Sequence, residues 1–181
     1  CTGPVSAQEI VIDSAYSVES GETVPIWVSV RGATNLDAYT VSVIYDPAVM
    51  SAATNFTFTP PGWSTVQNVP TAGTFMATGY QSAPNAKITG ESNLFVFDCT
   101  ALKNDGSLTT LNITINNIEE SGAAVYTYTT VNGTFTTLDE VAPNITITSP
   151  ADGATVPQDV TVTATITDVG GVNRSSVSIT V

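Results

Sequence analysis

The sequence predicts an all-β protein, with a complete β-sandwich followed by an incomplete second sandwich. Three observations lead to this fold class. Apolar and polar residues alternate in segments such as 24–30 and 40–45, which is the period of a half-buried strand. Turn-forming pairs, for example Ser20-Gly21 and Asp105-Gly106, interrupt the alternation at short intervals. Helical periodicity is nearly absent, and many short strands at this spacing are typical of a sandwich.

The individual strands follow from this alternation and from the turns between the segments. Asn132-Gly133 lies between two alternating segments and predicts a two-residue β-hairpin. A single helical turn is expected at residues 46–50. The strands expected in the first sandwich are residues 24–30, 40–45, 74–80, 94–101, 108–115, 126–131 and 134–138.

A domain boundary is expected at residues 139–143, a short polar linker that ends in Pro143. The segment before it divides into an N-terminal stretch, residues 1–8, and a first domain, residues 9–138. A complete immunoglobulin-like sandwich needs about seven strands and about 100 residues. Residues 144–181 therefore predict only part of such a domain. Its expected strands are residues 145–148, 160–167 and 177–181.

The charge balance excludes nucleic acid as a partner. The chain has 16 acidic and 4 basic residues, a formal net charge of −12. Such a surface repels phosphate groups and anionic membranes, because too few cations are present to neutralise them. No stretch has the roughly 20 apolar residues that a membrane-spanning helix needs. We expect neither a nucleic-acid partner nor a membrane span in this chain.

The residue types argue against catalysis and against a metal site. The chain has no histidine, which excludes a Ser-His-Asp triad and a histidine-based metal centre. The carboxylate pairs Glu119-Glu120 and Asp139-Glu140 are sequence neighbours, and neighbours along a strand point to opposite faces. No loop has the spaced aspartates of a calcium site. We expect no enzyme activity, no metal and no cofactor.

Several features favour an extracellular or cell-surface location with N-linked glycans as modifications. Cys1 is a lipidated N-terminus, a disulfide partner of Cys99 or an arbitrary starting point of the chain, and these alternatives stay open together with a signal-peptide remnant in residues 1–8. Cys99 shares the inward phase of Phe95 and Phe97 and is expected to be buried.

Asn-X-Ser/Thr sequons mark candidate glycosylation sites. They are Asn55, Asn112, Asn132, Asn144 and Asn173.

Four segments of the first domain resemble cohesin domains. Residues 21–30 resemble the second cohesin strand, and residues 39–50 contain the corner Tyr45-Asp46-Pro47. Residues 73–77 and 94–99 are similar to later strands of that family, in the same order. The resemblance spans about residues 9–138. It implies a nine-stranded jelly roll that binds a dockerin module through one sheet face.

At the corner Tyr45-Asp46-Pro47, we expect the Asp46 side chain to accept hydrogen bonds from backbone amides that follow it. We expect Tyr45 and Met50 to point into the core.

Residues 142–181 resemble bacterial surface immunoglobulin-like repeats. The similarity lies in residues 148–156 and in the stretch 168–172. Such repeats usually serve as spacers, and the strands that would follow Val181 in them are missing here. An autonomous spacer role is therefore not expected of this part alone.

A partner-binding face is expected on two strands that adjoin in the cohesin family. If the inward and outward alternation along each strand is as expected, every second residue points outward. The apolar residues among them would form a patch typical of an interface. A phase error of one residue is the alternative, and it would place these side chains in the core. Trp27 is expected to face outward, and Trp63 to lie in a loop that caps the sandwich. The candidate partner-binding residues are Thr40, Ser42, Ile44, Leu94, Val96 and Asp98.

Three functions remain in view, all without chemistry and all on the outside of a prokaryotic cell. The first is cohesin-like binding of a partner module such as a dockerin. The second is a structural subunit of a fibre or surface layer, in which a neighbouring copy supplies the strands that residues 144–181 lack. The third is carbohydrate binding through exposed aromatic side chains. The sequence does not decide between a partner protein and further copies of the same chain.

Overall fold

The computed structural model describes residues 7–53, 58–121, 127–172, 175 and 177–178. Within these residues it contains strands and no α-helix, which confirms the all-β fold class. The strands are β1 (Glu9–Ile12), β2 (Ala15–Val18), β3 (Thr23–Ile44), β4 (Met50–Ala53), β5 (Trp63–Thr71), β6 (Thr74–Gln81), β7 (Ile88–Ala101), β8 (Leu108–Glu120), β9 (Thr129–Val131), β10 (Gly133–Thr137), β11 (Asn144–Ser149) and β12 (Thr163–Thr167).

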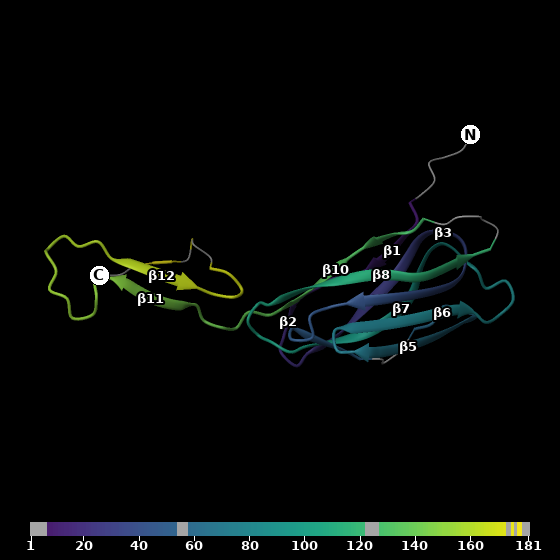
Figure 1. Cartoon of the computed structure of the whole chain (residues 1–181), viewed down its shortest axis with the longest axis horizontal. Coiled ribbons are helices and arrows are strands. Elements are labelled where there is room, and N and C mark those ends of the chain that lie inside the picture. Colours follow the sequence, from purple (N-terminus) through teal and green to yellow (C-terminus); the bar gives the residue numbers. More distant parts are fainter. Residues whose placement is uncertain (1–6, 54–57, 122–126, 173–174, 176, 179–181) are drawn as a thin grey trace, which may run out of the picture.

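Strand β3 is shared by both layers of the sandwich, because it bends in the middle. Its first half pairs with β1 and β7, and its second half pairs with β6 and β8. The register against β7 shifts between Val30 and Leu36, and Gly32 in this stretch has a φ of 67°. Glycine adopts this left-handed backbone without a steric penalty. One continuous sheet thus folds into a layer β2-β10-β8-β3-β6-β5 and a layer β9-β1-β3-β7-β4 (Figure 1).

The core lies between the two layers and is dominated by aromatic rings. Phe75 of the first layer stacks on Phe97 of the second, with ring centroids 4.3 Å apart. Phe95 lies 5.9 Å from Phe75 and 6.0 Å from Tyr39, and all four rings are fully buried. Burying one such side chain stabilises the fold by roughly 1.5–3 kcal/mol. Cys99 joins this core, as its inward phase predicts.

The corner after β3 has the expected geometry. The carboxylate of Asp46 accepts a hydrogen bond from the Ala48 amide at 2.8 Å, and the Asp46 carbonyl accepts from Met50 at 3.2 Å. The side chains of Tyr45 and Met50 are buried in the core. The corner residues therefore hold the fold and do not form a site.

The hairpin expected at Asn132-Gly133 is wrong. Strand β9 runs parallel to β1 in one layer, whereas β10 pairs with β8 and β2 in the other. The dipeptide carries the chain from one layer to the other. Gly133 is required there, because a Cβ atom at this position would lie 2.3 Å from the carbonyl oxygen of Asp13.

The loop position expected for Trp63 is also wrong. Trp63 begins β5, is only 6% exposed and packs in the core. Its indole N–H donates to the carbonyl of Ala86 at 2.6 Å, which satisfies the polar atom that burial would otherwise leave unpaired.

The C-terminal part forms a separate two-stranded antiparallel sheet of β11 and β12 (Figure 1). The register places Ile145 opposite Ile166 and Ile147 opposite Ala164 on one face, while Asn144, Thr146 and Thr167 share the other. Of the third expected strand, the described residues Val177 and Ser178 lie outside any strand. Within the described part of the chain, no helix has the length and apolar character needed to cross a membrane.

Candidate protein-binding face

One outer face of the sandwich is formed by β8, β3, β6 and β5. Val41, Val43 and Phe75 point inward and are fully buried, so their neighbours along each strand point outward. The register aligns the outward residues in rows across the four strands. We call the outward residues in and beside the rows of Thr40, Ser42 and Ile44 the neutral face: Thr40, Ser42, Ile44, Val66, Asn68, Thr74, Met76, Thr78, Asn112, Thr114, Asn116 and Asn117.

The neutral face contains no charged residue, although the chain has a formal net charge of −12. Carboxylates lie just beyond both ends of it, with Glu119 opposite Ala38 in the next row and the exposed Asp46 two residues after Ile44. Apolar side chains stand out from this face, with Ile44 47% and Val66 64% exposed, and Tyr80 borders it at 49%. Depletion of charge around exposed apolar residues is typical of the centre of a protein interface.

Hydrogen bonds between neighbouring strands hold the polar part of the neutral face in place. The hydroxyls of Thr40 and Thr78 lie 3.1 Å apart, and Ser42 donates to the side-chain oxygen of Asn116 at 2.8 Å. Ser42 is only 5% exposed as a result. These bonds leave a prearranged surface on which side-chain freedom is already reduced, which lowers the entropic cost of binding.

Charged residues lie on the other layer and at the ends of the sandwich. Glu9 is paired with Arg31 across β1 and β3. The three basic residues of the described chain each lie beside a carboxylate. The pairs are Arg31–Glu91 at 3.3 Å, Lys87–Asp37 at 3.9 Å and Lys103–Asp105 at 3.8 Å. The charged groups of the sandwich thus lie outside the neutral face.

Three of the six candidate binding residues lie together, as expected. Thr40, Ser42 and Ile44 are consecutive outward positions in the second half of β3. Ile44 is the exposed apolar residue of this group. Their role in binding stays a prediction.

The orientation expected for Leu94 is wrong. Leu94 is 0% exposed and belongs to the core. The register pairs Val28 with Phe95 but Ser29 with Asn93, so Leu94 is an extra residue in β7. Such a β-bulge breaks the alternation and turns the following side chains to the other face.

The expectation that Val96 and Asp98 adjoin Ile44 is also wrong. The β7 residues lie opposite Trp27 and Pro25 in the first half of β3, which belongs to the other layer. The bend in β3 separates them from the neutral face. Val96 is 2% exposed but is not part of the central core.

Trp27 is half-buried on the outer side of that layer, opposite Val96. Its ring meets Phe58 edge-on, with centroids 5.3 Å apart and planes at 68°. Trp27 and Phe58 thus form an aromatic pair on the layer opposite the neutral face.

The pattern of the sequence did not reveal Val66 as a member of the neutral face or Tyr80 as its neighbour. Tyr80 lies in an expected strand at the outward phase, so its position was available from alternation. Val66 lies in β5, which the turn residues around Pro60-Pro61-Gly62 had concealed.

Three of the five sequon asparagines lie on the described surface. Asn112, Asn132 and Asn144 are exposed. Asn55 and Asn173 lie outside the described residues, as does Cys1. Asn112 is opposite Ile44 in the register between β8 and β3 and so belongs to the neutral face itself.

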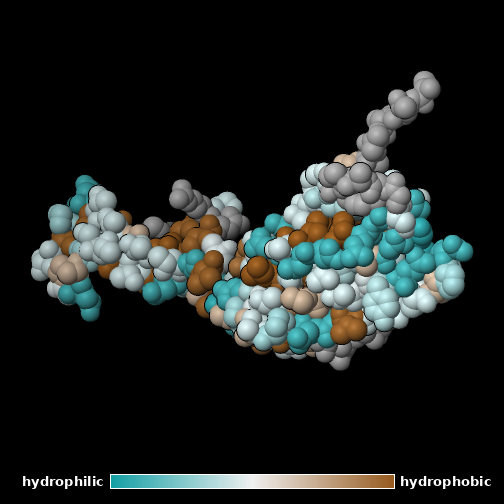
Figure 2. All heavy atoms as spheres, turned by 45° about the vertical axis from the view of Figure 1, so that its right-hand side comes forward, coloured by the Kyte–Doolittle hydropathy of each residue, from teal (hydrophilic) through white to brown (hydrophobic). Residues whose placement is uncertain are grey.

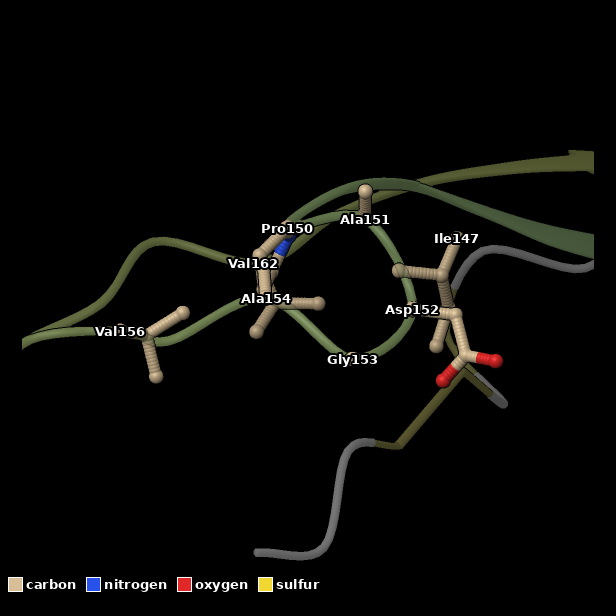
Figure 3. Close-up of a pocket in the computed structure, with 8 residues that line it drawn as sticks. All are labelled: Ile147, Pro150, Ala151, Asp152, Gly153, Ala154, Val156 and Val162. Carbon is tan, nitrogen blue, oxygen red and sulfur yellow. The ribbon is translucent and has the colours of Figure 1, made fainter.

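A second apolar surface lies on the C-terminal sheet. Ile145 and Ile147 are each 63% exposed, and Figure 2 shows hydrophobic side chains gathered on this part of the molecule. Next to Ile147, Val156 and Val162 border an open hollow of about 500 Å³ (Figure 3). Asp152 is the charged residue in its lining. This is the face that an immunoglobulin-like sandwich buries against its second sheet.

The titratable groups of the described chain do not assemble into a metal centre or a nucleophilic site. Among the described residues, no group of three or more Cys, Asp or Glu side chains converges on one point. Burial, and secondarily the nearby charge of Asp98, raises the pKa of the Cys99 thiol. A thiol in this state is a poor nucleophile, because the thiolate is the reactive form.

The larger sandwich has the fold of cohesin modules. It is similar to a non-cellulosomal cohesin from the archaeon Archaeoglobus fulgidus, with a TM-score of 0.60 and 17% identity over 74% of this chain and 93% of that one. A cohesin of ScaC from Acetivibrio cellulolyticus, solved with the ScaB dockerin, matches with a TM-score of 0.58 and 13% identity over 72% of this chain and 99% of that one. The cohesin of OlpA from Clostridium thermocellum, solved with Doc918, matches with a TM-score of 0.55 and 14% identity over 74% of this chain and 100% of that one.

The C-terminal part matches a family of bacterial immunoglobulin domains. The family model for the bacterial Ig domain covers residues 143–181. No curated protein sequence matches the chain. The chain is therefore similar to cohesin modules in its larger sandwich and to bacterial Ig domains at its C-terminal end. The expected domain limits at residues 9–138 and 139–143 stay a prediction.

Proposed function

We propose that this chain is a non-enzymatic assembly module on the outside of a prokaryotic cell, and that it binds a dockerin-like partner module through the neutral face. The observation that carries the proposal is the absence of charge from this face of a strongly acidic chain. The cohesin fold of the sandwich supports it, since the compared cohesins of ScaC and OlpA were solved with dockerins.

The physical reason is the cost of removing water from a surface. A charged side chain that a partner covers must find a counter-charge, or the binding free energy suffers. Hydroxyl and amide groups can exchange their bonds with water for bonds with a partner at little net cost. Ile44 and Val66 then supply the apolar contacts, and the acidic surroundings disfavour partners of like charge.

The extracellular location and the absence of catalysis belong to the same proposal. Similarity to cohesin modules and bacterial Ig domains supports both. The sequon at the exposed Asn144 supports exposure outside the cytoplasm. The inert state of the buried Cys99 agrees with a role without chemistry.

The test is a binding measurement with a matched pair of variants. The purified chain is titrated by calorimetry with recombinant dockerin modules, including those of the ScaB and Doc918 complexes. Ile44→Arg places a charge on the neutral face and should weaken binding at least 100-fold. Val131→Arg changes a 39% exposed residue of β9 in the other layer and should leave affinity within about twofold. Equal loss in both variants, or none in Ile44→Arg, would contradict the proposal.

A second candidate is a structural subunit whose C-terminal sheet is completed by strands of a neighbouring copy. The observation that favours it is the bare apolar face of Ile145 and Ile147. Light scattering over a range of concentrations tests it. Assemblies that form with the wild-type chain and dissolve with Ile147→Asp would favour this function, and a monomer at all concentrations would exclude it.

A further inference from the structure

The three sequons on the described surface differ in what their asparagines already do. N-glycosylation forms a bond from the side-chain nitrogen of asparagine to the anomeric carbon of a phosphate-activated sugar. The bond from that carbon to the phosphate oxygen breaks, and the amide loses one proton. The nitrogen must be accessible, and acceptor sequons accordingly lie in surface segments that an enzyme can reach.

Asn132 is engaged by the fold through both atoms of its side-chain amide. Its Oδ1 accepts the backbone N–H of Ile113 at 2.9 Å, and its Nδ2 donates to the side-chain oxygen of Asn112 at 3.1 Å. The first bond satisfies an amide of β8 just beyond the last pair with β10, Leu111–Gly133. The Asn132 side chain thus holds the chain to β8 by hydrogen bonds at the position where it crosses from one layer to the other.

Asn112 lies within β8, one residue after its last pair with β10 and opposite Ile44 of β3. Its neighbours Leu111 and Ile113 are held by β10 and by the Asn132 side chain, and β3 pairs along the other side. The sequon Asn112-Ile113-Thr114 cannot leave the sheet without breaking these bonds. A glycan there would also cover Ile44, which lies directly opposite.

Asn144 is in a different situation. It is the first residue of β11, is exposed, and its backbone has one neighbouring strand, β12, with which it pairs at Thr167. Within the described residues its side chain makes no hydrogen bond. Thr146, the hydroxyl residue of its sequon, is likewise exposed on the same face of the sheet.

We propose that Asn144 is the asparagine of these three that carries an N-linked glycan on the folded protein, and that Asn112 and Asn132 remain unmodified. The inference rests on the proposed extracellular location. A glycan on Asn144 extends from the polar face of β11, opposite to Ile145 and Ile147. It leaves both the neutral face and the apolar face of the C-terminal sheet uncovered.

The experiment removes each sequon without changing its asparagine. The full chain and the variants Thr146→Val, Thr114→Val and Thr134→Val are produced with a fused export signal in a prokaryotic host with an N-glycosylation pathway, and the exported protein is analysed by intact mass and glycopeptide mapping. Valine has the shape of threonine but lacks the hydroxyl that the transferase requires, so the hydrogen bonds of Asn132 are kept.

The expected result is that Thr146→Val loses one glycan, while Thr114→Val and Thr134→Val keep it and differ from the wild type only by the mass of the substitution itself. A glycan on Asn112 or Asn132, or a bare Asn144 in chain recovered from outside the cell, would overturn the inference and leave the proposed binding function standing.

Discussion

The hydroxyl of Tyr39 in β3 donates a hydrogen bond to the carbonyl oxygen of Leu94 in β7, at 3.1 Å. This bond joins the two layers at the bulge that turns Leu94 into the core. Tyr39 is fully buried, and burial raises its pKa well above the usual value. A buried hydroxyl without this partner would destabilise the fold by about 1–3 kcal/mol.

The inward position of Leu94 predicts a large difference from Ile44 in stability. Leu94→Ala leaves a cavity in a packed core and should lower the free energy of unfolding by about 2–5 kcal/mol. Ile44→Ala changes a surface residue and should alter it by less than about 0.5 kcal/mol. Urea denaturation followed by tryptophan fluorescence measures both. Similar values for the two variants would mean that Leu94 is not in the core.

Glu120 predicts a dependence of stability on pH. Its carboxylate is 8% exposed and accepts bonds from the Thr34 amide at 3.0 Å, the Thr34 hydroxyl at 2.7 Å and the Tyr128 hydroxyl. Burial by itself would raise the pKa of Glu120, but the bonds from Tyr128, Thr34 and Gln8 outweigh it and hold the pKa below its usual value. This contribution is fully present above the pKa of the unfolded chain and is lost as pH falls through the lower folded value.

Glu120→Gln should therefore destabilise the protein by about 1.5–3 kcal/mol at pH 7, because glutamine offers a weaker acceptor to the same donors. The gap from wild type should narrow below about pH 4, where the carboxyl group of the wild type takes up its proton. Thermal unfolding at pH 7 and pH 3 measures the gap. A gap that widens at low pH would contradict the role assigned to the carboxylate.

We expect the Cys99 thiol to react slowly with thiol reagents in the native protein. The thiol is fully buried and its pKa is raised by burial and by Asp98, so neither access nor charge favours attack. In a Cys1→Ser background, a thiol reagent should label the native protein at least 100-fold more slowly than protein in urea. Rapid labelling of the native protein would mean that β7 opens readily or that the thiol is exposed.

The Tyr39 ring packs so closely on Gly79 that no larger residue should fit at position 79. A Cβ atom at position 79 would lie 2.4 Å from the ring carbons of Tyr39, and the ring is held by the core around it. Gly79→Ala should therefore cost about 1–3 kcal/mol through displacement of packed groups. Thr78→Ala, one residue away and pointing outward, serves as the control. Equal stability of the two variants would place the Tyr39 ring elsewhere.

Alternation in the sequence was sufficient to predict most strands and the corner at Asp46. Strands β6, β8 and both halves of β3 follow from the period of two, because each buries one face and exposes the other. The bend between Val30 and Leu36 could not be predicted, because it depends on which strands pair with each half of β3. The local sequence does not show this. The crossover at Asn132-Gly133 has the same residues as a hairpin turn, and only the pairing of β9 with β1 and of β10 with β8 distinguishes the two.

The positions of the candidate binding residues were predicted in part for the same reason, and their role in binding stays a prediction. Thr40, Ser42 and Ile44 lie in a regular stretch, where the phase of one residue fixes the others. Leu94 lies at a bulge, where the phase is interrupted, and no local feature of the sequence marks it. The neutral face as a whole is formed by four strands that are distant in sequence, so its lack of charge became visible only when the register was known.

The most direct measurement of the central claim is an NMR titration of the isotope-labelled chain with a dockerin module that binds it. The neutral face as the binding site predicts the largest chemical-shift changes at Thr40, Ile44, Val66 and Thr78, with little change at Trp27 and Asp98 in the other layer. Changes centred on Trp27 and Asp98, or on the C-terminal sheet around Ile147, would contradict it.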